Sequence, residues 1–181
     1  MTQAQDYGTL ERGDGTVTVR FSRLLAHSPE KVWRALTETE HLAAWFPTTI
    51  EGAFTPGASL LFRFTTLTMA PMSGQVISCD PPKLLEFTWD DETLRFELDA
   101  HEAGTALAFT ATFAEIGKAA RDAAGWHVCL EQLAGDLDGA AQPTEDGQRW
   151  REVHPWYVAA FGPEASVLGP PQEWQDEYGP A

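Results

Sequence analysis

Long hydrophobic runs are missing from this sequence of 181 residues. No uninterrupted apolar stretch approaches the roughly 20 residues that a membrane-spanning helix requires. The Met1 end also lacks a basic segment followed by an apolar run, which is the pattern of a secretion signal. We therefore expect a cytoplasmic protein without membrane insertion.

Basic residues are scarce. Lys and Arg together number 12, against 27 Asp and Glu, which gives a formal net charge of -15. A surface with this charge repels phosphate backbones and anionic membranes. We therefore expect no nucleic acid among the partners of this protein.

Cysteine is rare as well. Only Cys79 and Cys129 are present, without CxxC spacing, and we interpret both as reduced, buried thiols. None of the five histidines pairs at metal-ligand spacing, and glycine-rich phosphate loops are absent. No Ser/His/Asp or Cys/His order is distinctive. The sequence therefore predicts neither a metal site nor a cofactor, and it identifies no catalytic residues.

What the sequence does contain is amphipathic periodicity. Residues 119–137 form the longest helical pattern, with apolar side chains at intervals of three and four. Upstream, residues 17–21, 94–100 and 107–113 alternate apolar and polar side chains, as half-buried strands do. Short turns between the strands favour an antiparallel sheet. The sequence predicts an α+β fold in which a curved antiparallel sheet wraps around the long C-terminal helix.

Two short helices are expected after the first strand. Ser28 followed by Pro29 matches a helix N-cap with proline at the first helical position, and a break between the helices is expected near Thr37 or Thr39. Pro47 should end the second helix.

Composition divides the chain into three parts. Residues 1–15 are polar and contain glycine, so we expect a flexible leader before a domain of residues 16–140. Residues 141–181 form a C-terminal extension, in which a short helix should be interrupted at Pro155. The extension has too many aromatic side chains for a solvated tail, so we expect it to pack onto the domain or onto a second copy of the chain in a homodimer. These side chains are Trp150, Trp156, Tyr157, Phe161 and Trp174.

Three motifs stand out between Thr16 and Gly139. They are Ser-Pro-x-x-Val-Trp-x-Ala-Leu from Ser28, Val-x-x-x-Asp-Pro-Pro-x-x-Leu-x-Phe-Thr-Trp from Val76, and Gly-Trp at Gly125. Together they resemble the Aha1-like (activator of Hsp90 ATPase homologue 1-like) branch of the START/Bet v 1 superfamily, also called SRPBCC domains. The resemblance implies the helix-grip fold, with an apolar cavity between sheet and helix. Some members of the superfamily bind lipids, sterols or plant hormones, and others are polyketide cyclases.

The cavity implied by this resemblance is the first candidate site. Inward side chains of the strands and facing side chains of the helix would bind a small hydrophobic molecule, lipid-like or aromatic. These residues are Phe62, Phe64, Val76, Phe87, Trp89, Phe96, Leu98, Phe109, Trp126, Cys129, Leu130 and Leu133. His127, Thr110 and Thr112 would supply polar groups that orient the ligand. The alternative interpretation is an ordinary solid core.

Two other functions remain open. A cyclase- or hydrolase-like enzyme acting on a hydrophobic substrate would need a titratable group in the cavity, for which His127, Glu51 and Asp90 are the candidates. An interaction or dimerisation module without a ligand would use the aromatic extension.

One glycine lies inside the long helix. Gly125 costs about 1 kcal/mol relative to alanine at such a position. We attribute its presence to a close approach of helix and strand or, alternatively, to a widened pocket mouth.

Overall fold

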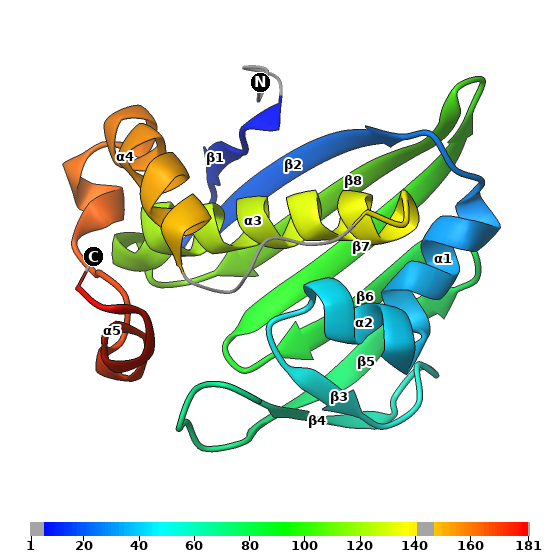
Figure 1. Ribbon diagram of the computed structural model, residues 1–181, viewed down its shortest axis with the longest axis horizontal. Coiled ribbons are helices and arrows are strands. Elements are labelled where there is room, and N and C mark those ends of the chain that lie inside the picture. Colours follow the sequence, from blue (N-terminus) through cyan, green and yellow to red (C-terminus); the bar gives the residue numbers. More distant parts are fainter. Residues whose placement is uncertain (1–5, 141–146, 181) are drawn as a thin grey trace.

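The computed structural model describes residues 6–140 and 147–180 of the chain. Antiparallel strands form one curved, eight-stranded sheet in the order β1-β2-β8-β7-β6-β5-β4-β3. The long helix α3 lies across one face of this sheet, with α1 and α2 beside one end of the helix and α4 beside the other (Figure 1). This is the predicted α+β helix-grip fold.

The elements have the following bounds. The strands are β1 (Thr9–Arg12), β2 (Val17–Leu25), β3 (Thr49–Glu51), β4 (Ser59–Arg63), β5 (Met72–Asp80), β6 (Leu84–Trp89), β7 (Glu92–His101) and β8 (Gly104–Phe113). The α-helices are α1 (Pro29–Thr37), α2 (Thr39–Trp45), α3 (Ala119–Leu137), α4 (Gln148–Phe161) and α5 (Gln172–Tyr178), and short 3-10 helices are η2 (Ile116–Lys118) and η3 (Pro163–Ser166).

Local sequence signals start and end the two short helices as predicted. The Ser28 hydroxyl accepts a hydrogen bond from the backbone N–H of Lys31 at 3.3 Å, and Pro29 takes the first helical position. Extended backbone at Glu38 separates α1 from α2, and Phe46, which precedes Pro47, is extended as well. The two helices therefore form a corner that covers one end of the sheet.

The prediction of a flexible leader is wrong for part of its length. Thr9–Arg12 form β1, which pairs antiparallel with β2. Tyr7 and Leu10 pack against the core, and the Tyr7 ring lies 4.0 Å from the Trp156 ring of the extension. A polar composition suggested a loose segment, but long-range contacts order it. Residues 1–5 of the predicted leader lie outside the described residues.

A row of phenylalanine rings fills the middle of the space between sheet and helix. Phe62, Phe87, Phe96, Phe109 and Phe21 belong to β4, β6, β7, β8 and β2, and successive ring centroids lie 6.0, 6.2, 4.6 and 6.1 Å apart. All five side chains are buried. Rings stacked at these distances leave no room for a ligand between them. The core is therefore solid in the middle of the sheet.

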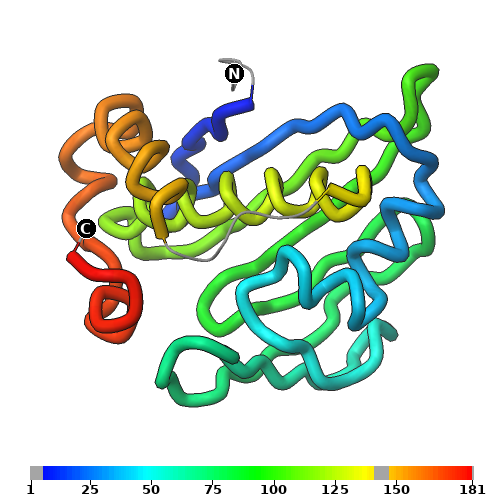
Figure 2. Tube along the Cα trace, viewed as in Figure 1, coloured from blue at the N-terminus to red at the C-terminus, as the bar shows by residue number. Residues whose placement is uncertain are grey.

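The C-terminal extension is more helical than the sequence suggested. We predicted a short helix interrupted at Pro155, but α4 runs through this residue. Helix α4 lies beside the N-terminal part of α3 (Figure 2). Val153, Tyr157 and Phe161, spaced by four, are buried, and the exposed Pro155 lies between them in sequence. Burial of this face outweighs the hydrogen bond that proline removes. The extension packs onto its own domain.

Within residues 6–140 and 147–180, no helix combines the length and the apolar character that crossing a membrane demands.

Candidate functional site

A pocket of about 660 Å³ lies beside the phenylalanine row, where the end of α2, the connection between β4 and β5, helix α3 and the C-terminal extension meet. We call it the tryptophan pocket. Its aromatic lining comes from Trp45, Phe46, Phe64, Trp89, Trp126, Trp150, Trp174 and Tyr178. Its other lining residues include Thr48, Met69, Met72, Glu92, Lys118, Arg121, Asp122, Gly125, Cys129, Glu131 and Arg149.

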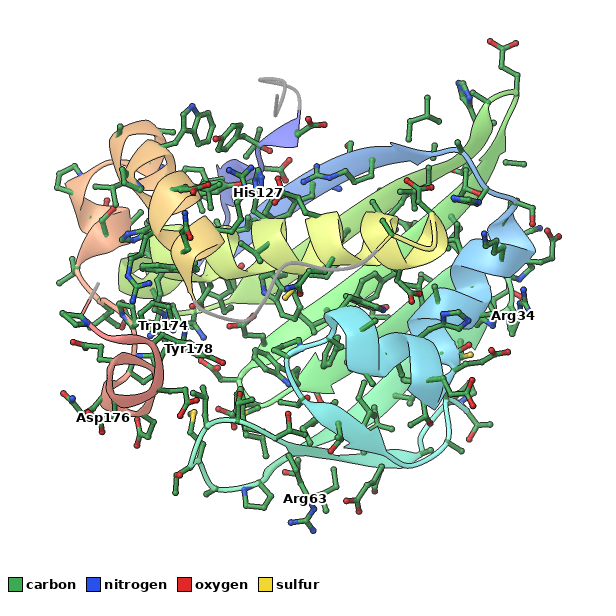
Figure 3. All side chains as sticks on the ribbon, in the orientation of Figure 1. Arg34, Arg63, His127, Trp174, Asp176 and Tyr178 are labelled. Atoms are coloured by element: carbon green, nitrogen blue, oxygen red, sulfur yellow. The ribbon has the colours of Figure 1, made fainter. Side chains whose placement is uncertain are left out.

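The extension builds one wall of this pocket. The hydroxyl groups of Tyr178 on α5 and Thr66 on the β4–β5 connection are 3.2 Å apart, which joins the extension to the far side of the pocket. Trp174 packs on Trp150 at 5.1 Å between ring centroids, and the Arg151 guanidinium lies 5.1 Å from the Trp174 ring. Figure 3 shows Trp174 and Tyr178 on the inner side of α5. The aromatic side chains of the extension thus form part of the pocket wall within a single chain.

The structure divides the predicted binding residues into two groups. Phe64, Trp89, Trp126 and Cys129 line the tryptophan pocket. The others are buried in the core and do not belong to its lining: Phe62, Val76, Phe87, Phe96, Leu98, Phe109, Leu130 and Leu133. The stacked phenylalanine row fills the centre of the sheet, so the open volume lies to one side of it.

The three predicted polar residues also lie away from the pocket. Thr110 and Thr112 follow the outward phase of β8, and the Thr112 hydroxyl lies 2.9 Å from that of Thr18 on β2. His127 is fully buried on the side of α3 that faces α4, apart from Trp174 and Tyr178 (Figure 3). None of the three is part of the pocket lining within the described chain.

His127 belongs to a hydrogen-bond chain that fixes the extension to the domain. The Tyr157 hydroxyl accepts a hydrogen bond from the backbone N–H of Gly8 at 3.0 Å and forms a second one with Nδ1 of His127 at 2.8 Å. Because the ionised Glu131 carboxylate can only accept, Nε2–H of His127 donates a hydrogen bond to it at 3.1 Å. Arg149 closes the chain with two hydrogen bonds to Glu131. This arrangement explains the buried histidine without any ligand.

Burial and hydrogen-bond partners determine which groups of this hydrogen-bond chain are ionised. Burial opposes the charge of Glu131, but hydrogen bonds from Arg149 and His127 outweigh it and lower the pKa of this carboxyl group to about 2. Burial raises the pKa of Tyr157, and the Gly8 N–H opposes that effect only in part. Tyr157 is therefore a neutral hydroxyl at neutral pH.

The pocket wall contains a charged cluster that was not predicted from the sequence. Lys118 Nζ lies 2.9 Å from Glu92 Oε1, 3.0 Å from Asp91 Oδ1 and 3.7 Å from Asp122 Oδ2. Oε2 of Glu92, Oδ2 of Asp122, Nε1 of Trp89 and Oγ1 of Thr48 are buried without a hydrogen-bond partner among the described residues. One sequence signal could have located the cluster, because Glu92 is in phase with the inward-facing Leu94.

The cluster contains a carboxyl group with an unusual proton affinity. Burial and the negative charge of Asp122 raise the pKa of Glu92 to about 8, and Lys118 offsets this only in part. The pKa of Lys118 is lowered by burial, but the carboxylates of Glu92 and Asp122 reverse the direction and raise it. The ammonium stays charged at neutral pH, and the raised pKa favours the protonated form of Glu92.

Gly125 of α3 lines the pocket. A Cβ atom at this position would meet nothing within 4 Å, so our first explanation, a close approach of helix and strand, is wrong. The open space in front of Gly125 agrees with the alternative of a widened pocket.

Comparisons with known proteins agree with this fold. The model of the family "Activator of Hsp90 ATPase homolog 1-like protein" matches residues 26–138. The conserved protein of unknown function EF2215 from Enterococcus faecalis is 23% identical, with a TM-score of 0.71 over 84% of this chain and 88% of that protein. CalU16 from Micromonospora echinospora is 20% identical, with a TM-score of 0.63 over 81% and 88%. Protein MLL2253 from Mesorhizobium loti is 26% identical, with a TM-score of 0.60 over 68% and 98%.

No curated protein matches the chain. The family match covers more than half of the chain and includes the strands and the helix that frame the pocket. The chain therefore belongs to the activator of Hsp90 ATPase homologue 1-like family, within the SRPBCC superfamily.

Proposed function

We propose that the protein binds a small hydrophobic molecule, lipid-like or aromatic, in the tryptophan pocket. The observation that carries this proposal is an open volume of about 660 Å³ with aromatic walls. This volume lies within the range of about 300–1,000 Å³ that ligand pockets occupy. Flat aromatic faces favour ligands of the same kind through burial of apolar area and ring stacking.

The proposed contact residues come from the grip domain and from the extension. Phe64, Trp89 and Trp126 would hold the ligand from the domain side, and Trp150 and Trp174 from the extension. Because both parts contribute, the pocket requires the folded extension.

Native mass spectrometry of freshly purified protein tests the proposal, followed by organic extraction of any bound compound. We expect the wild type to carry a small molecule, and Gly125→Leu, which places a side chain in the open space, to lose it. Ala159→Leu, on the exposed side of α4, is the matched control and should retain the compound. Equal occupancy in all three proteins would place the compound outside this pocket.

One observation favours a second candidate function, an enzyme of the cyclase or hydrolase kind. The buried carboxyl group of Glu92 lines the pocket and has its pKa raised to about 8, which suits a group that gives and takes protons near neutral pH. Incubation of the extracted compound with wild type and Glu92→Gln tests this function. Conversion by the wild type alone would support it, and recovery of unchanged compound from both would contradict it.

Homodimerisation through the extension stays a prediction. Light scattering of the full chain tests it, since a mass near twice the 19.9 kDa of one chain would be expected of a dimer.

A further inference from the structure

The wall of the tryptophan pocket carries more acidic than basic side chains. The acidic residues are Asp90, Asp91, Glu92, Asp122 and Glu131, and the basic residues are Lys118, Arg121 and Arg149. The whole chain has a formal net charge of -15. The field around the pocket therefore favours cations over anions.

Most of these charges are already matched. Arg149 Nη2 lies 2.6 Å from Glu131 Oε1, and Arg121 Nε lies 2.5 Å from Asp122 Oδ1. Lys118, the remaining cation, donates hydrogen bonds both to Asp91 and to Glu92. Glu92 therefore shares Lys118, the one cation that contacts it among the described residues, with Asp91.

Two carboxyl oxygens of lining residues lack a hydrogen-bond donor within the described chain, although Oδ2 of Asp122 lies 3.7 Å from Lys118 Nζ. Glu92 is 4% exposed, and its Oε2 and Oδ2 of Asp122 have no hydrogen-bond partner among the described residues. A hydrogen bond between these two carboxyl groups requires a proton on one of them, which agrees with the raised pKa of Glu92. A ligand that brings its own hydrogen-bond donors and a positive charge would replace that proton.

Other lining groups also favour a ligand that carries hydrogen-bond donors and a positive charge. The Thr48 hydroxyl, 3% exposed and also without a partner in the described chain, lines this pocket from the end of α2. The rings of Trp89 and Trp126, 5.4 Å apart, also line it. Aromatic faces attract cations, most strongly where water is excluded.

We propose that the tryptophan pocket selects hydrophobic amines in their cationic form, with the ammonium group hydrogen-bonded to Oε2 of Glu92 and Oδ2 of Asp122. The apolar body of the amine lies against Trp89 and Trp126. When the ammonium enters, the protonated Glu92 releases its proton to solvent and becomes a carboxylate. One positive charge therefore leaves as the proton while another enters as the ammonium, and no bond in the ligand changes. This inference rests on the proposed function.

Isothermal titration calorimetry with three naphthalene compounds tests the inference. 2-Naphthylmethylamine carries the ammonium, 2-naphthylmethanol is its neutral analogue, and 2-naphthoic acid is the anionic one. At neutral pH we expect the amine to bind at least about tenfold more tightly than the alcohol, because hydrogen bonds to charged groups are stronger, and the acid to bind most weakly. Titrations in two buffers with different ionisation enthalpies should report release of about one proton per amine.

Glu92→Gln keeps the shape of the side chain but removes its ability to ionise. The ratio of amine to alcohol affinity should fall to about one and proton release should disappear. Glu102→Gln, at the exposed turn between β7 and β8, is the matched control and should leave both quantities unchanged. If Glu92→Gln does not fold, the wild type provides the test, because its preference for the amine should increase as the pH rises through the pKa of Glu92 of about 8.

The outcomes separate this inference from the proposed function. Equal affinities for amine and alcohol would overturn the selection of amines but leave hydrophobic binding intact. Tightest binding of the acid would also overturn it, because Lys118 and Arg121 would then dominate recognition. Failure of all three compounds to bind would count against both.

Discussion

Lys118 Nζ lies 2.9 Å from Oε1 of Glu92, and only 9% and 4% of these two side chains are exposed. The ammonium comes from the residue before α3, and the carboxyl group from the first residue of β7. Their contact joins helix to sheet at the base of the pocket. Because both groups are removed from water, loss of either partner is costly.

Lys118→Met should destabilise the protein strongly. Without the ammonium, Glu92 and Asp91 lose their hydrogen-bond donor, and Glu92 does so in a buried site, which costs about 1–3 kcal/mol of unfolding free energy. Urea denaturation followed by circular dichroism measures this quantity. Lys83→Met, at an exposed position, is the control and should change it little. Similar values for the two variants would show that the buried cluster does not stabilise the fold.

The stability contributed by protonated Glu92 should decrease with rising pH. The pKa of this group is about 8 in the folded protein, against 4.5 for an ordinary glutamate. Because the folded state binds this proton more tightly than the unfolded state, the stabilisation is complete below the unfolded pKa and is lost as the pH rises through the folded one. The unfolding free energy of the wild type minus that of Glu92→Gln should therefore fall between pH 4.5 and about 8. Urea titrations across this range test the sign, and a difference that grows with pH would contradict it.

Gly125→Ala should stabilise the protein. Alanine is favoured over glycine inside a helix by about 1 kcal/mol, and the added Cβ meets no atom within 4 Å. Thermal unfolding should therefore show a higher midpoint. Gly74→Ala is a contrasting variant, because its Cβ would clash with the carbonyl oxygen of Thr88 and should destabilise the sheet. A lower midpoint for Gly125→Ala would mean that another constraint acts on this residue.

Tyr157→Phe should loosen the extension. The Gly8 N–H and His127 Nδ1 would both lose a buried partner, which costs about 1–3 kcal/mol. Hydrogen exchange at the amide of Gly8 should accelerate, and the unfolding free energy should fall. Tyr178→Phe removes a hydroxyl group at an exposed hydrogen bond and should have a smaller effect. Unchanged protection of Gly8 would show that this hydrogen bond does not hold the N-terminal segment.

Local structure could be predicted from the sequence where it depends on residues that are close together in the chain. Alternation along residues 94–100 correctly predicts that Leu94, Phe96 and Leu98 are buried, although Ala100 near the end of β7 is exposed. Ser28-Pro29 predicts the start of α1. The strand β1 and the unbroken helix α4 could not be predicted in this way. They depend on contacts between distant residues, such as Tyr7 with Trp156, that no local pattern contains.

The position of the open volume was harder to predict than the fold around it. The alternation of apolar and polar side chains predicts that Phe96 and Phe109 face the interior. It does not tell whether their rings meet or leave a gap. In the structure their centroids are 4.6 Å apart, which closes the centre of the sheet. The pocket wall also includes Trp150 and Trp174 from the extension, whose packing no part of the resemblance described. Glu92 was also missed, although its phase with the inward-facing Leu94 could have identified it as a buried carboxyl group.

The lining of the pocket gives the protein a built-in optical reporter. Five of its seven tryptophans, Trp45, Trp89, Trp126, Trp150 and Trp174, belong to this lining. The emission of an indole ring depends on the polarity of its surroundings and on nearby quenching groups. Entry of a compound that does not absorb in the same range should therefore change the intrinsic fluorescence of the unlabelled protein, so that a library of compounds can be screened without attaching a dye.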